Sequence, residues 1–260
     1  TVGRICGKNY YNNQKCGGKL NGENMIIAVS GKGGVGKSTI SSLMIKQLVE
    51  NKKSPVLAVD ADPNSNLGYY LGIDCPAGTA VSDLREDEFK KNPAGISKVE
   101  WLNMKMQECI FETDKGFDLL VMGRPEGPGC YCAVNNLLRD FLGKISRQYP
   151  FVVIDNEAGM EHLSRRTNNE IDVLFIVAEP TNISFLAAEN IKNAAEHLPI
   201  KIIKKYLVVN KYQNENIKNI DGLDMIGYIR YNKNISDNFD AAHSEIKDDI
   251  RNILLKSKIL

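Results

Sequence analysis

Eight residues, Gly31-Lys-Gly-Gly-Val-Gly-Lys-Ser38, restrict the fold of this chain more than any other feature of its sequence. They follow the apolar run Met25–Ser30 and precede a helical pattern over Lys37–Glu50. A glycine, four residues and then Gly-Lys-Ser is the spacing of a P-loop, whose backbone N–H groups surround phosphate oxygens. Side chains would block that approach, which is why the loop is rich in glycine. The sequence therefore predicts a phosphate-binding loop between a strand and a helix.

Several positions of this loop have an expected role. Lys37 should reach the β- and γ-phosphates, and the hydroxyl of Ser38 should ligate Mg²⁺. The helix that begins there directs the positive end of its dipole at the same anion. The residues expected to contact a nucleotide are Gly31, Gly33, Gly34, Val35, Gly36, Lys37, Ser38 and Thr39.

The rest of the chain alternates short apolar runs with helical patterns. Several runs are apolar without alternation, as expected for strands that are buried on both faces of a parallel sheet. We expect an α/β fold, with a doubly wound, mostly parallel sheet and helices on both faces. The predicted strands are Met25–Ser30, Pro55–Asp60, Phe117–Met122, Phe151–Asp155, Val173–Ala178, Tyr206–Asn210 and Leu223–Ile229, and the predicted helices are Lys37–Glu50, Ala133–Arg147, Ser184–Glu196 and Glu245–Leu255.

The same alternation suggests how the chain is divided. Residues 25–260 read as a single domain, and residues 1–24, with Cys6 and Cys16, as a flexible N-terminal arm outside it. Residues 85–116 are charged and mixed, so we expect a helical, surface-exposed segment to which the sequence gives no role. Cys75 and Cys109 are assigned to packing.

Composition excludes some classes of protein. The 33 basic and 32 acidic residues leave a net charge of +1, which argues against a protein that coats nucleic acid or anionic lipid. The longest apolar run, Val173–Ala178, is far shorter than the ~20 residues of a membrane-spanning helix. Six cysteines are too few for a disulfide scaffold, and the polar start does not resemble a secretory signal. We therefore expect a cytoplasmic location.

Lys32 narrows the type of P-loop. A lysine directly after the first glycine is not required for binding phosphate, and taken alone it reads as a solvated loop residue. In context, Lys32-Gly-Gly-Val-Gly-Lys-Ser-Thr39 resembles the deviant Walker A loop of septum-site and partition ATPases, nitrogenase reductase and the arsenite-pump ATPase. In that family the equivalent lysine crosses a dimer interface to the partner's nucleotide, as an arginine finger does. The resemblance implies a homodimer with two nucleotides between its subunits.

Two predicted strands end in carboxylates. Asp60 ends the second strand, where loops meet the ligand in an open α/β sheet, so we expect it to contact the nucleotide, and Asp62 follows it. By the resemblance, Asp62 orients the attacking water. Asp155 ends an apolar strand in the Walker B pattern, which places it near Mg²⁺, directly or through water, and Gly159 completes an Asp-x-x-x-Gly switch that can sense a γ-phosphate. Taken alone, each carboxylate is equally well read as a cap or turn aspartate.

Asn210 and Lys211 come after the strand residues Tyr206–Val209, at a place that resembles the family's adenine contact. An asparagine amide can pair with both a donor and an acceptor on a purine edge. An ordinary turn asparagine is the competing interpretation.

Cys130 and Cys132 distinguish this chain from a general relative. In an extended segment, residues two apart point to the same side, so both sulfurs can face one ion. Two such pairs related by a dimer two-fold axis would supply four sulfurs, a set that suits Zn²⁺ and admits Ni²⁺. A single Cys-x-Cys is a weak signal, and two ordinary loop cysteines are the alternative.

A second resemblance favours the metal site. Gly123-Arg-Pro-Glu-Gly-Pro-Gly-Cys-Tyr-Cys132, with Asp155-Asn-Glu-Ala-Gly-Met-Glu-His-Leu-Ser164, resembles the CooC-type nickel-insertion ATPases. This implies that Cys130 and Cys132 bind Zn²⁺ or Ni²⁺ at a dimer interface switched by ATP. It also implies that carbon monoxide dehydrogenase or acetyl-CoA synthase is the client. Arg230 departs from the family, whose members often have proline there, and we read His162 as a structural residue.

Two other functions remain open. A positioning ATPase would bind membrane or DNA, and Ile250–Leu260 has apolar and basic residues. We expect that segment to pack as a last helix onto the sheet instead, with no nucleic-acid partner and no stable membrane association. An Fe–S electron donor like nitrogenase reductase would hold a cluster with four cysteines across the two-fold axis.

Overall fold

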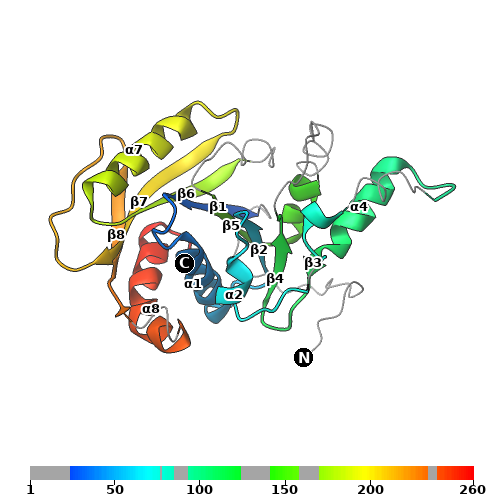
Figure 1. Ribbon diagram of the computed structural model, residues 1–260, viewed down its shortest axis with the longest axis horizontal. Coiled ribbons are helices and arrows are strands. Elements are labelled where there is room, and N and C mark those ends of the chain that lie inside the picture. Colours follow the sequence, from blue (N-terminus) through cyan, green and yellow to red (C-terminus); the bar gives the residue numbers. More distant parts are fainter. Residues whose placement is uncertain (1–23, 77, 85–92, 124–140, 158–169, 234–238) are drawn as a thin grey trace.

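The computed structural model describes residues 24–76, 78–84, 93–123, 141–157, 170–233 and 239–260. In this part of the chain eight strands form one sheet in the order β3-β4-β2-β5-β1-β6-β7-β8 (Figure 1). Every neighbouring pair is parallel except β3 and β4, which are antiparallel. The predicted α/β class is therefore confirmed.

The strands are buried as their composition predicts. All six residues of β2 and all eight of β6 are buried, because helices or loops cover both faces of the sheet centre. The bounds of the strands are β1 Met25–Gly31, β2 Val56–Ala61, β3 Ile110–Phe111, β4 Phe117–Val121, β5 Phe151–Asn156, β6 Ile171–Ala178, β7 Ile202–Tyr212 and β8 Asp224–Arg230.

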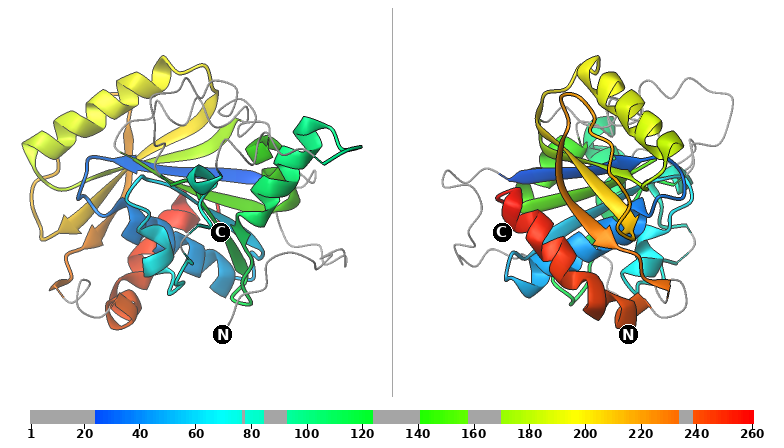
Figure 2. Two further views of the ribbon diagram at one scale, coloured as in Figure 1. Left: turned by 45° about the vertical axis from the view of Figure 1, so that its right-hand side comes forward. Right: turned by 90° about the vertical axis from the view of Figure 1, so that its left-hand side faces the viewer.

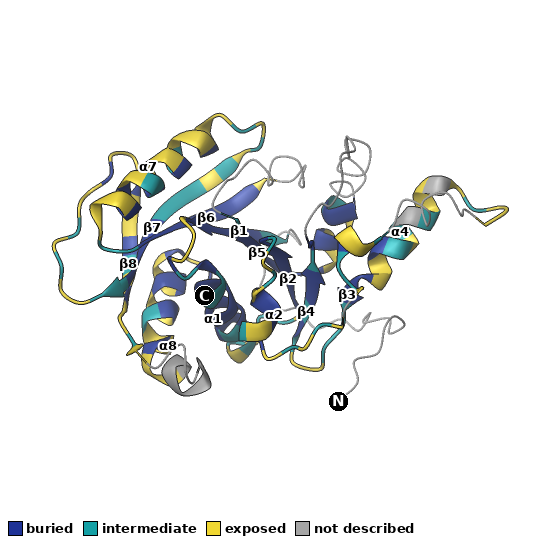
Figure 3. Cartoon of the chain, in the orientation of Figure 1, coloured by how far each residue is buried: buried dark blue, intermediate teal, exposed yellow. Residues whose placement is uncertain are grey.

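Helices lie on both faces of the sheet, as Figures 1 and 2 show. One face is covered by α1 (Lys37–Glu50), α2 (Leu67–Tyr70) and α8 (Phe239–Lys256), and the opposite face by α7 (Asn182–Glu196). The burial pattern in Figure 3 follows this division, with buried positions toward the sheet and exposed positions outward. Each face therefore has its own apolar core.

The last helix packs as expected. Ile246, Ile250 and Ile253 of α8 are 2% exposed or less, and they join the core that α1 also lines. Apolar residues that recur every three or four positions place one stripe of a helix against its support. With the exception of the exposed Leu255, the apolar side chains of Ile250–Leu260 therefore pack inside the fold. In the described ranges, no helix is both long enough and apolar enough to cross a membrane.

The segment 85–116 differs in part from its prediction. Its helix, α4 (Lys98–Glu108), is present, and its capping box of Ser97 and Glu100 explains where it begins. The expected surface exposure does not hold throughout the segment, because Met106 and Ile110 are buried and Ile110 lies in the antiparallel strand β3. Two apolar residues after a helix are too short a pattern to predict a strand.

Two other predicted elements differ from the structure in their bounds or in how much of them is described. Strand β7 runs from Ile202, earlier than predicted, because its first half carries lysines that interrupt the apolar run. The predicted helix Ala133–Arg147 falls largely outside the described residues. Residues 141–145 are helical, and Phe141 and Ile145 are buried. A 3₁₀ turn, η2 (Ser146–Gln148), follows them. Another 3₁₀ turn, η1 (Val81–Asp83), lies before the 85–116 segment.

Candidate functional site

The P-loop lies at the centre of the sheet. It joins β1 to α1, and β1 is flanked by β5 on one side and β6 on the other. The chain leaves β1 toward β2 and returns later toward β6, so the strand order reverses around this loop. Ligands of open α/β sheets bind at such a reversal, outside the carboxyl ends of the strands. The fold therefore places the predicted loop where a ligand is expected.

Glycine is needed at different positions of the loop for different structural reasons. A Cβ on Gly31 would lie 2.5 Å from the carbonyl oxygen of Val177, so β1 and β6 leave no room for a side chain there. Gly34 and Gly36 have φ values of +83° and +92°, which favour glycine. Around Gly33 and Gly34, no heavy atom of the described residues lies within 4 Å of where a Cβ would stand. The middle of the loop is therefore open on its outer side.

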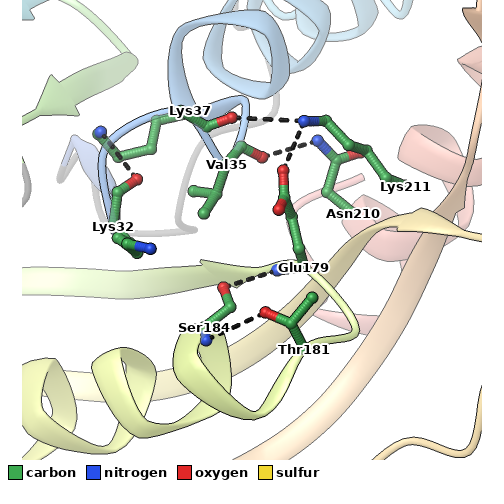
Figure 4. Close-up of polar contacts among 9 residues, drawn as sticks. Lys32, Val35, Lys37, Glu179, Thr181, Ser184, Asn210 and Lys211 are labelled. Atoms are coloured by element: carbon green, nitrogen blue, oxygen red, sulfur yellow. Dashed lines mark hydrogen bonds and ion pairs between the residues drawn. The ribbon is translucent and has the colours of Figure 1, made fainter.

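The two lysines of the loop differ in exposure. Lys37 is 6% exposed, and its Nζ lies 3.4 Å from the carbonyl oxygen of Lys32, inside the curve of the loop. The side chain of Lys32 is exposed instead (Figure 4). Lys37 is thus placed to meet a ligand of its own loop. Lys32 is accessible to a second molecule.

Asp60 and Asp155 are adjacent in the sheet. They are paired between β2 and β5, and both are fully buried. Burial, and next to it the neighbouring Asp155 charge, raise the pKa of Asp60 to about 7. Burial also raises the pKa of Asp155, to about 6, against the lowering effect of hydrogen bonds from Ser38 and Ser41 and of the Lys37 charge. Two buried carboxyl groups side by side favour a cation between the loop and the sheet.

The donor set at Asp155 fits Mg²⁺. Its Oδ1 accepts a hydrogen bond from the Ser41 hydroxyl at 3.2 Å, and Ser38 also hydrogen-bonds to the carboxylate. Its Oδ2 is buried without a hydrogen-bond partner among the described residues. An unpaired buried carboxylate oxygen next to a hydroxyl matches the oxygen ligands that Mg²⁺ prefers. Ser41 was not predicted, although its position one helical turn after Ser38 would have suggested it.

Asp60 holds the loop that carries Asp62. Its two oxygens accept hydrogen bonds from the backbone N–H groups of Asp62, at 3.2 Å, and of Leu67, at 2.9 Å. Asp62 in turn accepts hydrogen bonds from the backbone and side-chain N–H groups of Asn64. Asp60 was predicted as a nucleotide contact, and in the structure its carboxylate braces the neighbouring loop. Asp62 is 8% exposed at the same end of the sheet.

Asn210 and Lys211 contact the P-loop itself. The side-chain amide of Asn210 donates to the carbonyl oxygen of Val35 at 2.8 Å, which uses its nitrogen and leaves its oxygen for another partner. The ammonium group of Lys211 lies 3.5 Å from the carbonyl oxygen of Gly34 and pairs with the carboxylate of Glu179 (Figure 4). Glu179 was not predicted. The signal was present, because Glu179 follows the buried strand β6 as Asp155 ends β5.

The remaining candidates divide into two groups. Cys109 is buried and Cys75 is half-buried against the core, so both pack as predicted, and burial raises the pKa of the Cys75 thiol. Arg230 turns to α8, where it contacts Asp249 and the backbone of Glu245. Gly159, Cys130, Cys132, His162, Cys6 and Cys16 lie outside the described residues. Within the described ranges, no group of three or more His, Cys, Asp or Glu side chains could hold a metal ion.

Comparison of sequences gives one family and several relatives. The model of the CobQ/CobB/MinD/ParA nucleotide-binding domain matches residues 26–244. An uncharacterized ATP-binding protein of Methanocaldococcus jannaschii is 46% identical over 224 residues, which cover 82% of this chain and 87% of that protein. The carbon monoxide dehydrogenase accessory protein CooC of Rhodospirillum rubrum is 35% identical over 192 residues, which cover 69% of this chain and 72% of CooC.

Comparison of structures supports the same fold. The septum site-determining protein MinD of Pyrococcus horikoshii, solved with Mg-ADP, matches with a TM-score of 0.63 and 17% identity, over 90% of this chain and 94% of that one. A ParA family ATPase from Chlorobium tepidum matches with a TM-score of 0.60 and 17% identity, over 90% and 92% of the two chains.

Proposed function

Because this chain belongs to the CobQ/CobB/MinD/ParA family of nucleotide-binding domains and is an ATPase, we propose that it is a metallochaperone that uses ATP to assist nickel insertion. Its clients would be carbon monoxide dehydrogenase or acetyl-CoA synthase. The observation that carries the proposal is the 35% identity to CooC across more than two thirds of both chains. In a family that also includes partition and septum-site proteins, a relative at this level is the most direct guide to the client.

The residues of the site support ATP hydrolysis in a dimer. Lys37, held inside the loop, would bind the phosphates, and Ser38 with the unpaired oxygen of Asp155 would hold Mg²⁺. Magnesium at that position would neutralise charge that develops on the phosphates. Asp62 would orient the attacking water, and the exposed Lys32 would reach the nucleotide of a second subunit. Gly159 would sense the γ-phosphate.

The base of the nucleotide would lie against Asn210. Its Nδ2 already bonds to the P-loop, so its Oδ1 is the atom left to accept a hydrogen bond from the amino group of adenine. Arg230 is engaged with α8, so it would not take the place of the proline that family members often carry there.

The metal is cargo in this proposal. Cys130 and Cys132 would supply two thiolates, and the same pair of a second subunit would complete a four-sulfur site for Ni²⁺ or Zn²⁺. ATP would favour the closed dimer, and hydrolysis would release it. This requires that ATP bind the closed state more tightly than the open state.

The test is the metal content of the protein. The double variant Cys130→Ser, Cys132→Ser should lose roughly one metal ion per dimer when both proteins are purified anaerobically and analysed for nickel and zinc. The variant Cys75→Ser, at a half-buried packing position, is the matched control and should keep its metal. Equal metal content in the double variant and the wild type would reject the bridging site. A coloured protein with iron and sulfide would point to an electron donor instead.

A positioning ATPase is the second candidate, because this chain has the fold of MinD and ParA family proteins. The burial pattern speaks against α8 itself as a membrane anchor, since its apolar stripe packs in the core. Co-sedimentation with anionic liposomes, with and without ATP, separates the two candidates. ATP-dependent sedimentation would favour the positioning ATPase.

A further inference from the structure

The P-loop is held from outside at two consecutive peptide groups. The Asn210 amide donates to the carbonyl oxygen of Val35 at 2.8 Å, and the Lys211 ammonium lies 3.5 Å from the carbonyl oxygen of Gly34. Both donors come from the end of β7, which is not a neighbour of β1 in the sheet. Figure 4 shows them beside the loop. The loop's outward carbonyls therefore have fixed partners that a nucleotide does not provide.

These two carbonyls matter because a phosphate cradle works in one orientation only. Its N–H groups must point at the anion and its carbonyl oxygens away from it. Gly34, at φ +83° and without a side chain, has wide conformational freedom, and apart from its chain neighbours no described heavy atom lies within 4 Å of where its Cβ would stand. After a rotation of its peptide, a carbonyl oxygen would face the phosphate and repel it. A cation at the outer side of Gly34 opposes that rotation.

Lys211 is itself anchored. Its ammonium pairs with the Glu179 carboxylate at the end of the adjacent strand β6. The backbone N–H of Glu179 donates to the Ser184 hydroxyl at 2.9 Å, and the backbone N–H of Ser184 donates to the Thr181 hydroxyl at 3.2 Å. These bonds fix the first turn of α7. The contact therefore connects the tip of the P-loop to the start of a helix on the opposite face from α1.

The backbone of Lys211 gives a second, independent observation. Its φ is +57°, in the left-handed region that residues with long side chains rarely adopt. Such conformations persist where the surroundings require them, and they gather at ligand sites. Glycine or asparagine would suit this backbone better. A lysine at this position indicates that its side chain has a functional role.

We propose that Lys211 and Glu179 are positioning residues of the nucleotide site and form a clasp that keeps the Gly34 carbonyl turned away from bound phosphate. The inference rests on the proposal that ATP binds at Gly31–Thr39, and it is independent of the metal cargo. The clasp would act on the phosphates through the loop, whereas Asn210 is proposed to contact the base as well.

The test compares ATP affinity with stability. Lys211→Asn removes the ammonium and suits the left-handed backbone, so the nucleotide-free protein should keep its midpoint of thermal unfolding. Its Kd for a fluorescent ATP analogue should rise about fivefold, the size expected for one partly exposed charged contact, through faster dissociation. Glu179→Gln should act in the same direction. The double variant should bind no more weakly than Lys211→Asn alone, because both changes break one unit.

Controls separate the clasp from the site and from general charge effects. Lys201 and Glu170 form an exposed ion pair at 2.7 Å near the amino ends of the same two strands, and Lys201→Gln should leave ATP affinity unchanged. Lys211→Arg should restore binding. Lys37→Ala should abolish it, and if it does not, the loop is not the ATP site and the proposed function fails.

Two results would overturn the clasp alone. One is loss of ATP binding in Lys37→Ala together with wild-type affinity in Lys211→Asn and Glu179→Gln. The other is an affinity loss in Lys211→Asn that is accompanied by a matching drop in thermal stability and is not restored by arginine. That result would show that Lys211 and Glu179 stabilise the fold and do not position the phosphate loop.

Discussion

The two carboxylate oxygens of Asp155 have different surroundings. It is fully buried at the end of β5, and it has two hydroxyl partners and one oxygen without a partner among the described residues. A carboxylate in such a place costs stability until a cation joins it. The nucleotide-free protein should therefore be least stable at pH values at which the Asp155 carboxylate is charged.

This gives a pH dependence with a defined sign. The pKa of Asp155 is about 6 in the folded protein against 3.8 for the ordinary group, so the folded state binds its proton more tightly than the unfolded state. Its contribution to stability is complete below pH 4 and is lost as the pH rises through about 6. Relative to Asp155→Asn, the wild type should lose about 1 kcal/mol between pH 5 and pH 7.5. Urea unfolding without magnesium or nucleotide measures this, and two parallel curves would contradict it.

Lys32 is a separate case, because its side chain is exposed while Lys37 is buried. If Lys32 acts on a second subunit's nucleotide, Lys32→Gln should bind ATP within about twofold of the wild type but lose at least about tenfold in turnover, as cations supplied in trans do. Steady-state hydrolysis and nucleotide titration measure the two effects. Lys247→Gln, at an exposed position of α8, is the control. Unchanged turnover in Lys32→Gln would remove the trans-acting role.

Strands β1 and β6 leave no room for a side chain at the first glycine of the loop. A methyl group on Gly31 would stand 2.5 Å from the carbonyl oxygen of Val177 and 3.0 Å from the Val35 side chain. Gly31→Ala should therefore destabilise the protein by about 1–3 kcal/mol, the cost of overpacking. Gly33→Ala, which meets no described heavy atom, should unfold like the wild type. Chemical denaturation of both variants checks this prediction, and equal stability of the two would show that the strands can separate there.

The elements differ in how much the sequence predicts about them. The buried central strands were predicted within two residues, because an apolar run bounded by turns has few alternatives. Strand β3 and the early start of β7 were missed, since two residues or an interrupted run give no pattern. The P-loop residues were found because their spacing is local. Ser41 and Glu179 had local signals that were missed, but their contacts with Asp155 and Lys211 join elements that meet only in the fold, so the sequence could not predict those contacts.

The whole molecule is proposed to work as a pair. Scattering at saturating nonhydrolysable ATP and magnesium should give about twice the mass of one 28.9 kDa chain. Without nucleotide the mass should be lower, because the open state lacks the bridging phosphates. A single-chain mass under saturating nucleotide would remove both the shared lysine and the shared sulfur site from the mechanism.

The central place of β1 has a consequence for how the molecule opens. Backbone amides exchange with solvent first at the margins of a sheet and last at its middle. Strands β3 and β8 form the two margins, whereas the strands that carry Asp60, Asp155 and the phosphate loop are adjacent in the interior. Deuterium uptake should therefore begin at Ile110–Phe111 and Asp224–Arg230. The backbone amides of β2, β5 and β1 should exchange only when the whole protein unfolds.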